Sequence, residues 1–479
     1  MNLHDTLDVY VEINGESVRA GTLGASFNGI RALGGSWFEY DAGYDQAPGA
    51  YPLDPSLPLG RSRSYSGEDQ QLFGAFQDLT PDDWGERVIN ANLQRLRSTG
   101  VDAPRSIGKF DYLTIASDEA RLGAIRFQPS GGGQWLGPAS VPNLSQKKLD
   151  AYSSAASRLE AHEATAEDIE LLNAPGSSAG GARPKVTVRL GGNLKLLKLP
   201  SDRDSGRDGE AWEYLAITLA KNANISVQSA ERLRVSGGKT SLALDRFDRT
   251  PDGSRLGFMS ARTAMEIGDQ EHGTITYLDL ADATDSLTAG DRKQLRDLFK
   301  RVALTLLINN VDDHWKNHAF IRQGEGWALS PAYDINPSPT RGVVLSRPVS
   351  SSDDPSDRDI RNLVSTADAY SLSGEEAAQS LGEVLTAVRE WATIARDIGI
   401  SAGEIEVMKV AFSEDQQAHV ERAIRNLGGR SIIDLGTDSP GDFQRSKESE
   451  GSSGATWVSP HVRNGKPVAG FWRHTPRRE

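Results

Sequence analysis

Residues 309–317 read Asn-Asn-Val-Asp-Asp-His-Trp-Lys-Asn, and this stretch is the most informative feature of the chain. Asp334 follows Asn317 by 17 residues, in the dipeptide Tyr333-Asp334. The segment between them predicts a β-hairpin that runs out over 319–322, turns at 324–326 and returns over 327–329. Such a hairpin would bring Asp334 back beside Asn317.

The residue types in this stretch predict a phosphoryl-transfer centre. In protein kinases one aspartate orients the attacking hydroxyl, while a downstream asparagine and a second aspartate hold Mg²⁺ against the phosphates of ATP. We assign the metal-binding roles to Asn317 and Asp334. Composition does not separate Asp312 from Asp313 as the base. Asp312 is favoured because it stands two residues before His314 and five before Asn317, as in a compact catalytic loop. His314 would contact phosphate or hold the loop.

The same stretch permits a rival interpretation as a metal hydrolase. His314 and His318 are four residues apart and have two aspartates beside them. That function needs a further helix that supplies ligands, and the sequence contains no His-Glu-x-x-His motif. A histidine pair at this spacing is more often structural.

Bulk composition narrows the class of protein. A length of 479 residues predicts two or three domains. The hydrophobic fraction of 37% is enough to form their buried cores, so we expect a globular protein. A formal charge of −13 argues against a general binder of nucleic acid or anionic membranes. Because there is no cysteine, disulfides, thiolate zinc sites and a cysteine nucleophile are excluded.

Targeting signals are missing from the printed sequence. Residues 1–5 have no basic region followed by an apolar core, and no stretch approaches the roughly 20 apolar residues of a membrane span. We therefore expect a soluble, cytoplasmic protein with no membrane partner.

The order of elements predicts an α+β fold with two lobes. Alternating residues 9–13 and the turn Asn14-Gly15 begin a β-rich N-terminal module, and 82–96 has helical spacing. Strands are predicted over 112–115, 123–127, 185–190 and 194–199, and a helix over 210–223. Capping boxes at 288–291 and 373–376 begin further helices. The predicted domains are an N-terminal subdomain (1–105), a sheet-rich lobe (106–250), a helical lobe (251–434), and a linker with a basic tail (435–479) that contains a possible hairpin at Asn464-Gly465.

A glycine-rich segment, 176–185, precedes one predicted strand and could lay backbone N–H groups along phosphates. Its candidate cofactor-binding residues are Ser177, Ser178, Gly180 and Gly181. A solvent-exposed hairpin would use the same residue types. The segment lacks the Gly-Lys-Ser/Thr ending of a P-loop, so a Walker-type NTPase is disfavoured.

Lys198 is embedded in the apolar strand Leu196-Leu197-Lys198-Leu199. A buried lysine needs a partner, and Glu213 on the following helix could supply it, as in the lysine–glutamate pair of kinases. The alternative is a lysine that reaches solvent from a strand edge. Lys195 has the opposite parity and is expected to face solvent.

A strand ending in dense alternating charge, 242–249, is the candidate inter-lobe hinge. Its backbone could pair with adenine, and Asp245, Phe247 and Asp248 are the candidate cofactor-binding residues. The alternative is a strand that ends in structural ion pairs.

Together these motifs resemble the HipA family of bacterial serine/threonine kinase toxins from type II toxin–antitoxin systems. The resemblance rests on Asn310-x-Asp312-x-His314-x-Lys316-Asn317, on the run 329–334 (Leu-Ser-Pro-Ala-Tyr-Asp) and on the hinge 245–249, in the family's order. It extends to Ser56-Leu57-Pro58-Leu59 and to 76–81 in the N-terminal module, and covers roughly residues 8 to 430. The chain departs from the family's pattern at Asp245, where glutamate is usual, at 259–263 and in the basic tail.

The resemblance implies a kinase-like fold, ATP with Mg²⁺, and a small helix-turn-helix antitoxin through which alone DNA is contacted. It implies protein substrates of translation, notably aminoacyl-tRNA synthetases, and autophosphorylation at Ser177, with Ser178 as the alternative. Asp312, Lys198 and His314 would then be catalytic. The alternative function is a nucleotide-sensing module that binds the antitoxin or repressor and has little kinase activity.

Overall fold

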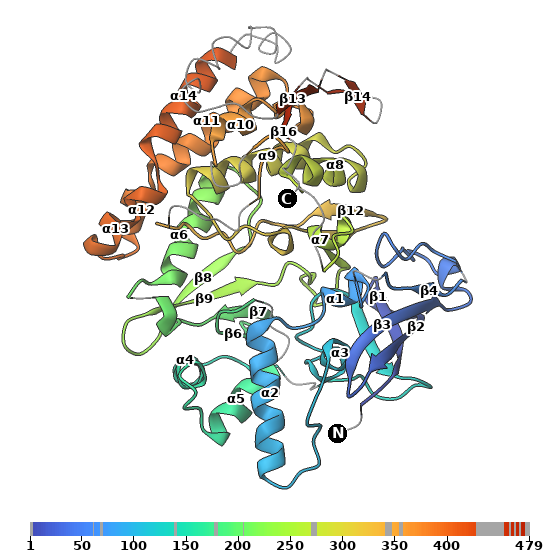
Figure 1. Cartoon of the computed structure of the whole chain (residues 1–479). Helices are drawn as coiled ribbons and strands as arrows, with labels where there is room; N and C mark the ends of the chain where they lie inside the picture. The colour runs from blue at the N-terminus through green and yellow to red at the C-terminus, as the bar shows by residue number, and fades with distance from the viewer. Residues whose placement is uncertain are drawn as a thin grey trace. The chain divides into compact units, whose positions relative to one another are not determined.

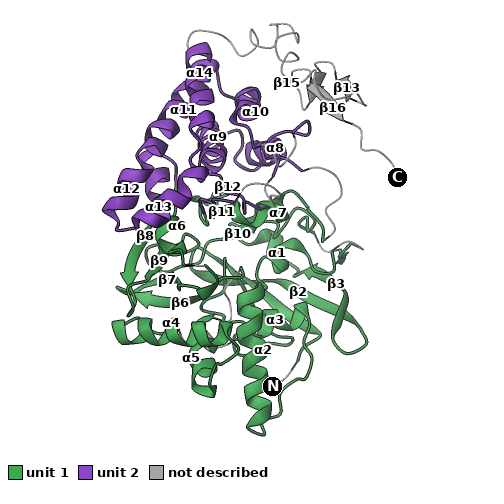
Figure 2. Cartoon of the chain, turned by 60° about the vertical axis from the view of Figure 1, so that its left-hand side comes forward, with its two compact units in different colours: residues 1–217, 227–272, 315–334 green, residues 218–226, 273–314, 335–479 purple. Residues whose placement is uncertain are grey.

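The computed structural model describes residues 3–60, 62–67, 70–137, 141–176, 181–204, 206–269, 275–340, 347–353 and 358–427, and the backbone of four short strands between 455 and 474. Figure 1 shows its helices and strands. The chain divides into two compact units (Figure 2): the first contains 1–217, 227–272 and 315–334, and the second 218–226, 273–314 and 335–479.

The first unit begins with a five-stranded antiparallel sheet in the order β4-β3-β2-β1-β5. Its strands are β1 (Thr6–Ile13), β2 (Glu16–Asn28), β3 (Ala32–Tyr40), β4 (Ser64–Tyr65) and β5 (Ile125–Pro129). The predicted turn between β1 and β2 is confirmed, because Asn14 and Gly15 both have positive φ (52° and 82°), as a type I′ turn requires.

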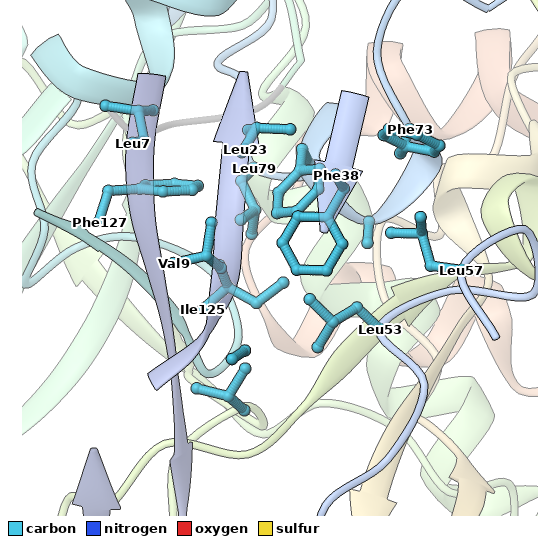
Figure 3. Packing of buried hydrophobic residues seen from close by; sticks show 14 of the residues in the cluster. Leu7, Val9, Leu23, Phe38, Leu53, Leu57, Phe73, Leu79, Ile125 and Phe127 are labelled. Atoms are coloured by element: carbon cyan, nitrogen blue, oxygen red, sulfur yellow. The ribbon is translucent and has the colours of Figure 1, made fainter. Parts of the chain in front are cut away.

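One face of this sheet carries an apolar core (Figure 3). Leu7 and Val9 of β1, Leu23 of β2, Phe38 of β3 and Phe127 of β5 are fully buried there. Alternate residues of each strand point to this face, which explains the period-two pattern of residues 9–13. The sheet thus includes a strand from 125–129, beyond the predicted domain boundary at residue 105. The bounds of the four predicted domains stay predictions.

Three helices complete this region: α1 (Gly74–Gln77), α2 (Asp83–Ser98) and α3 (Lys109–Ile115). The helix predicted over 82–96 is confirmed as α2. The strand predicted over 112–115 is wrong, since these residues form α3. The carboxylate of Asp111 accepts a hydrogen bond from the backbone N–H of Gly108 (2.9 Å) and starts a helical turn. An apolar run this short does not distinguish strand from helix by its pattern.

A second sheet of the first unit has the order β6-β7-β9-β8. The bounds are β6 (Lys185–Leu190), β7 (Asn193–Lys198), β8 (Ala230–Arg234) and β9 (Thr240–Asp245), and the helices nearby in sequence are α4 (Gln146–Glu160), α5 (Ala166–Gly176) and α6 (Gly209–Asn222). Trp84 and Val88 of α2 share its apolar core with Val186 and Leu197. Thus α2 packs on β6, the strand that follows the glycine-rich segment, and on its neighbour β7.

The predicted hairpin after Asn317 is confirmed. A three-stranded sheet has the order β10-β11-β12, with β10 at Phe258–Ser260, β11 at Ala319–Gln323 and β12 at Gly326–Leu329. Short helix α7 (Ala261–Ala264) follows β10.

The second unit is helical. Its helices are α8 (Tyr277–Leu287), α9 (Arg292–Leu307), α10 (Ile360–Val364), α11 (Gly374–Arg389), α12 (Trp391–Asp397), α13 (Ala402–Met408) and α14 (Glu414–Leu427). The capping box at Ser373 and Glu376 is confirmed at α11. The box predicted at Thr288 is wrong: Thr288 ends α8, and Asp291 caps α9 by accepting from the backbone N–H of Lys293 (2.9 Å). The α+β class, with sheets toward the N-terminus and helices toward the C-terminus, is confirmed.

The tail contains four short strands: β13 (Ala455–Val458), β14 (His461–Arg463), β15 (Lys466–Val468) and β16 (Phe471–His474). The strands of the predicted hairpin are present, because β14 pairs antiparallel with β15, while Asn464 and Gly465 lie outside the described residues. Residues 435–454 of the predicted linker lie outside the described residues. None of the helices in the described part of the chain is long and apolar enough to cross a membrane.

Candidate active site

Lys198 is the centre of the candidate site in the first unit. It ends strand β7, and its side chain is 5% exposed. Its Nζ donates to both carboxylate oxygens of Glu213 on α6, each at 2.7 Å, and to Oδ1 of Asp334, also at 2.7 Å. The predicted Lys198–Glu213 pair is therefore present, and Asp334, which lies 136 residues away in sequence, joins it.

Electrostatics keep this lysine charged. Burial by itself lowers the pKa of Lys198, but the nearby carboxylates of Asp334 and Glu213 outweigh burial and raise the pKa above its ordinary value. Such a cation has the charge needed to hold the phosphates of a nucleotide.

Lys185 is a second buried cation, which the sequence analysis missed. It lies directly opposite Lys198 in the β6–β7 pairing and is 7% exposed. Among the described residues, no carboxylate lies within ion-pair distance of its Nζ. Burial, and next the charge of Lys198, lower its pKa. A buried lysine without a close anion fits a place where an anionic ligand binds.

Gly181, the last glycine of the glycine-rich segment, lies against the side chain of Lys185. Gly181 has φ +78°, and a Cβ there would stand 2.8 Å from Nζ of Lys185. Glycine adopts that conformation without strain, and any Cβ at this position would require the amine of Lys185 to move. Ser177, Ser178 and Gly180 lie outside the described residues, so their predicted roles stay predictions.

Arg183, two residues after Gly181, contacts a buried pair of acidic residues, Asp204 and Glu210. Its Nη1 donates to Oδ2 of Asp204 at 3.0 Å and lies 3.6 Å from Oε1 of Glu210. Glu210 is 2% exposed, and its second oxygen has no hydrogen-bond partner among the described residues. Burial raises the pKa of Glu210 to about 8, although Arg183 opposes that change.

The segment that carries Asn317 is fixed beside Asp334 within the same unit. Asn317 belongs to a 3-10 turn, Trp315–Asn317, and is buried. The hydroxyl of Tyr333 donates to the carbonyl of Lys316 at 2.6 Å, which joins the residues immediately before Asn317 and Asp334. Asp334 has φ +55°, a conformation that is uncommon for aspartate and typical of functional sites.

Asn317 and Asp334 suit the metal predicted for them. Carboxylate and amide oxygens are hard donors of the kind that Mg²⁺ prefers, and Asp334 remains 34% exposed. Within the described residues there is no group of three or more His, Asp or Glu side chains arranged to hold a metal by themselves. A magnesium ion here would depend on phosphate oxygens in addition to protein ligands.

The candidate hinge is tied by ion pairs. Lys195, which was expected to face solvent, is half-buried and pairs with the carboxylate of Asp245. Both backbone groups of Asp245 are used, since its N–H donates to Ser229 (2.9 Å) and its carbonyl accepts from Gln228 (2.6 Å). Pairing with adenine would therefore fall to the residues that follow Asp245.

Asp248 is buried at 1% exposure and accepts from Arg246, Arg249 and the backbone N–H of Gly123 at 2.6 to 2.7 Å. Burial alone would raise its pKa, but the two guanidinium groups outweigh burial and hold the pKa well below its usual range. This position gives Asp248 a structural ion-pair role, and binding of a cofactor by it stays a prediction. Phe247 lies against the ring of Tyr333, with 5.1 Å between ring centroids.

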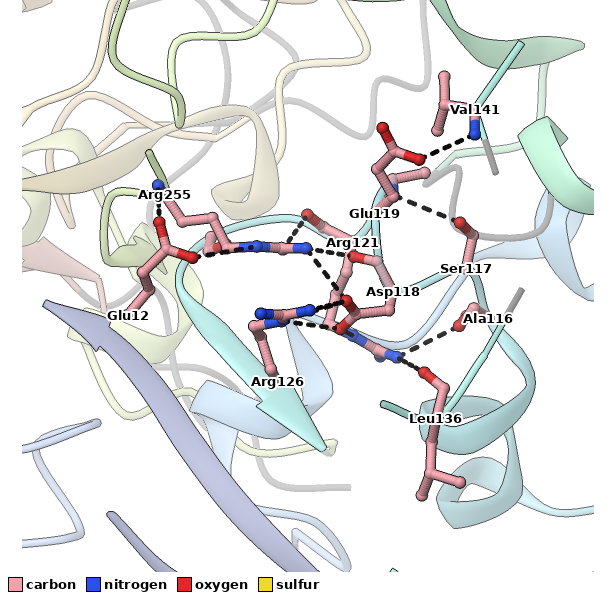
Figure 4. A network of polar contacts seen from close by, with 12 residues as sticks. Glu12, Ala116, Ser117, Asp118, Glu119, Arg121, Arg126, Leu136, Val141 and Arg255 are labelled. Atoms are coloured by element: carbon pink, nitrogen blue, oxygen red, sulfur yellow. Dashed lines mark hydrogen bonds and ion pairs between the residues drawn. The ribbon is translucent and has the colours of Figure 1, made fainter. Parts of the chain in front are cut away.

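A network of arginines surrounds Asp118 in the loop before β5 (Figure 4). Arg126 donates to Asp118 at 2.6 Å, and Arg255 donates to the backbone carbonyl of Asp118 at the same distance. Arg246 donates to the carbonyls of Ala120 and Arg121. Because these carbonyls belong to the loop before β5, the hinge and the N-terminal sheet are held together.

Asp312 and His314 belong to the second unit. The chain enters the first unit at the next residue, Trp315. Asp312 is exposed, whereas Asp313 is 3% exposed and accepts a short hydrogen bond from the buried hydroxyl of Tyr277. The carboxylate of Asp313 is thus used in a buried hydrogen bond, which favours Asp312 as the base. Nδ1 of His314 is buried without a hydrogen-bond partner among the described residues. His318, the other histidine of the rival hydrolase motif, is buried in the first unit.

Comparisons with known proteins identify the family. The model of the HipA N-terminal domain matches residues 12–127, and that of the HipA-like C-terminal domain matches 177–392. Among solved structures, the chain resembles HipA of Shewanella oneidensis MR-1, solved with HipB and its operator DNA, with a TM-score of 0.57 and 16% identity over 90% of this chain and 99% of that one. The kinase CtkA of Helicobacter pylori aligns with a TM-score of 0.36 and 13% identity over 52% of this chain and 94% of that one.

The comparison with curated proteins yields no match. The two domain models match in the expected order and together span strands β2 to β4 of the N-terminal sheet, Lys198, the hinge and the motif at 309–317. The chain belongs to the HipA family.

Proposed function

We propose that the chain is an ATP-dependent serine/threonine protein kinase of the HipA toxin type, which phosphorylates a translation-linked protein and thereby inhibits growth. The observation that carries this proposal is Lys198, buried between Glu213 and Asp334 within hydrogen-bond distance of both. In kinases the same lysine–glutamate pair and a metal-binding aspartate define the active nucleotide site.

The residues around Lys198 have separate roles in binding the nucleotide. Lys198 and Lys185 bind and orient the phosphates, while the backbone at Gly181 approaches them closely. When bound, ATP supplies the phosphoryl group and Mg²⁺ offsets the charge of the phosphates. Asn317 and Asp334 would hold the metal.

Asp312 orients the hydroxyl of the substrate and accepts its proton, and the exposure of this carboxylate suits contact with a protein substrate. His314 supports the phosphate. Most of the rate enhancement would come from positioning and charge stabilisation.

The proposed partners follow from the family. The Shewanella oneidensis relative was solved with HipB and operator DNA. We propose a small helix-turn-helix antitoxin for this chain, with DNA reached only through it. The net charge of −13 favours indirect over direct DNA contact. The protein substrate would be an aminoacyl-tRNA synthetase or another component of translation.

Phosphoproteomics of cells that express the wild type or Asp312→Ala tests the proposal and identifies the target. We expect phosphosites on a small set of translation proteins with the wild type and their absence with the variant. Equal phosphoproteomes, with nucleotide binding retained in both proteins, would instead favour the nucleotide-sensing module.

A further inference from the structure

The N-terminus of helix α2 makes an unusual use of its capping residue. Asp82 is the N-cap of α2, but its side chain makes no capping hydrogen bond within the helix. An aspartate at this position ordinarily accepts from the second or third backbone N–H of its helix. Here the carboxylate points to two partners outside the helix.

Those partners are parts of the candidate site that are remote in sequence. Oδ2 of Asp82 accepts from the backbone N–H of Gly181 at 2.8 Å, and Oδ1 accepts from Nζ of Lys316 at 2.8 Å. Gly181 is the last glycine of the glycine-rich segment, and Lys316 directly precedes Asn317. One carboxylate therefore joins Gly181 to the segment that carries the predicted metal ligand.

A second residue of the same helix strengthens this attachment. The backbone N–H of Trp84 donates to the carbonyl of Gly181 (3.1 Å), and its indole Nε1 donates to the carbonyl of Lys185 (2.8 Å). Both backbone groups of Gly181 are thus bound by the start of α2. Lys316 is likewise held twice, by Asp82 and, through its carbonyl, by Tyr333.

The electrostatics fit an ionised carboxylate. Burial tends to raise the pKa of Asp82, but Lys316 and the N–H of Gly181 outweigh burial, so the pKa lies below its ordinary value. The charge at this junction is therefore present throughout the neutral range.

We propose that Asp82 is a positioning residue for nucleotide binding, through which the N-terminal part of the chain holds Gly181 and the Asn317 segment in one geometry. The inference rests on the proposed function, because it assigns Asp82 to the same nucleotide site. It also makes the N-terminal helix α2 a required component of that site.

Two substitutions in the full-length chain separate positioning from simple structural support. Asp82→Asn has one acceptor oxygen and cannot serve Gly181 and Lys316 together. Asp82→Ser is too short for both but can cap α2, so the helix keeps or gains stability. Asp83→Asn is the matched control, since Asp83 is the next residue of the helix and is exposed.

The readouts are the dissociation constant of an N-methylanthraniloyl-labelled ATP with Mg²⁺, hydrogen exchange at the Gly181 amide, and the unfolding midpoint. We expect both Asp82 variants to weaken nucleotide binding about fivefold to tenfold, as the loss of a partly exposed charge-assisted hydrogen bond predicts. Exchange at Gly181 should accelerate in both. Asp82→Ser should match the Asp83→Asn control in unfolding midpoint.

Nucleotide affinity and Gly181 exchange equal to those of Asp83→Asn would overturn the inference. So would a loss of affinity that occurs only together with a comparable loss of stability in Asp82→Ser. A wild type that binds no nucleotide contradicts the proposed function instead, and the exchange at Gly181 then decides by itself whether Asp82 holds the loop.

Discussion

Replacing Lys198 by methionine tests the electrostatic centre of the site. Methionine keeps most of the volume of the side chain but removes the charge that Glu213 faces. Glu213 is 3% exposed, so without Lys198 its carboxylate must take up a proton or remain buried and unpaired. Breaking a buried pair in this way typically destabilises a protein by about 3–5 kcal/mol.

The protonation route sets the size of the effect. The ordinary pKa of Glu213 is 4.5. Protonating such a group at pH 7 costs about 3.4 kcal/mol, whereas at pH 5 it costs only about 0.7 kcal/mol. We therefore expect Lys198→Met to lower the free energy of unfolding by about 3 kcal/mol at pH 7 and by about 1 kcal/mol at pH 5. The sign follows because the folded variant binds more protons than the unfolded chain, so its stability falls as pH rises.

Urea unfolding at both pH values, followed by tryptophan fluorescence, measures this difference. The double variant Lys198→Met/Glu213→Gln should recover much of the loss, because the buried carboxylate is gone and Asp334, which also loses its bond to Lys198, is 34% exposed and can be hydrated. Lys239→Met is the control: it breaks an exposed pair with Asp202 (51% and 60% exposed) and should change stability by less than about 1 kcal/mol. A Lys198→Met protein as stable as the wild type at pH 7, or a defect of equal size at pH 5, would refute the reasoning.

Three further predictions concern single side chains. Asp312→Asn should reduce phosphoryl transfer by at least about 100-fold without changing the unfolding midpoint, because the side chain is exposed; a parallel rate assay and melting curve check both. Asp313→Asn should lower the free energy of unfolding by about 1–3 kcal/mol, because it weakens the buried bond from Tyr277, and a melting curve like that of Asp312→Asn would contradict this role. Glu210 has a pKa of about 8 in the folded protein against an ordinary value of 4.5, so from pH 5 to 8 the unfolded chain releases a proton that the folded protein keeps, and stability falls as pH rises. The stability of Glu210→Gln relative to the wild type should rise over that interval by at most about 1.4 kcal/mol per pH unit, and a constant difference would exclude the shift.

Local chemistry explains what could be predicted of the fold. The Asn14-Gly15 turn and the capping box at Ser373 are read from neighbouring residues, and both are present. The strand predicted over 112–115 was wrong because the backbone N–H of Gly108 donates to the carboxylate of Asp111 and starts a helix. This bond outweighs the strand preference of a short apolar run. Thr288 failed as a cap because two helices meet there and Asp291 supplies the bond to the second.

The candidate site could be predicted only in part, for a related reason. Lys198 was visible as a charge in an apolar strand, and Glu213 as an acid on the next helix. Lys185 was missed because it is the last residue of the glycine-rich segment, where a lysine is ordinarily expected to be exposed to solvent. Asp82 lies 234 residues from Lys316, and no local pattern connects them. Only the tertiary structure brings such a pair together.

Transfer of labelled phosphate from ATP tests the central claim most directly. Purified wild type and Asp312→Ala are incubated with Mg²⁺ and γ-phosphate-labelled ATP, alone and with a bacterial extract whose own kinases have been heat-inactivated. We predict label on a serine or threonine of the chain or of an extract protein with the wild type, and none with Asp312→Ala. The absence of label with the wild type, or equal labelling with both proteins, would contradict the account.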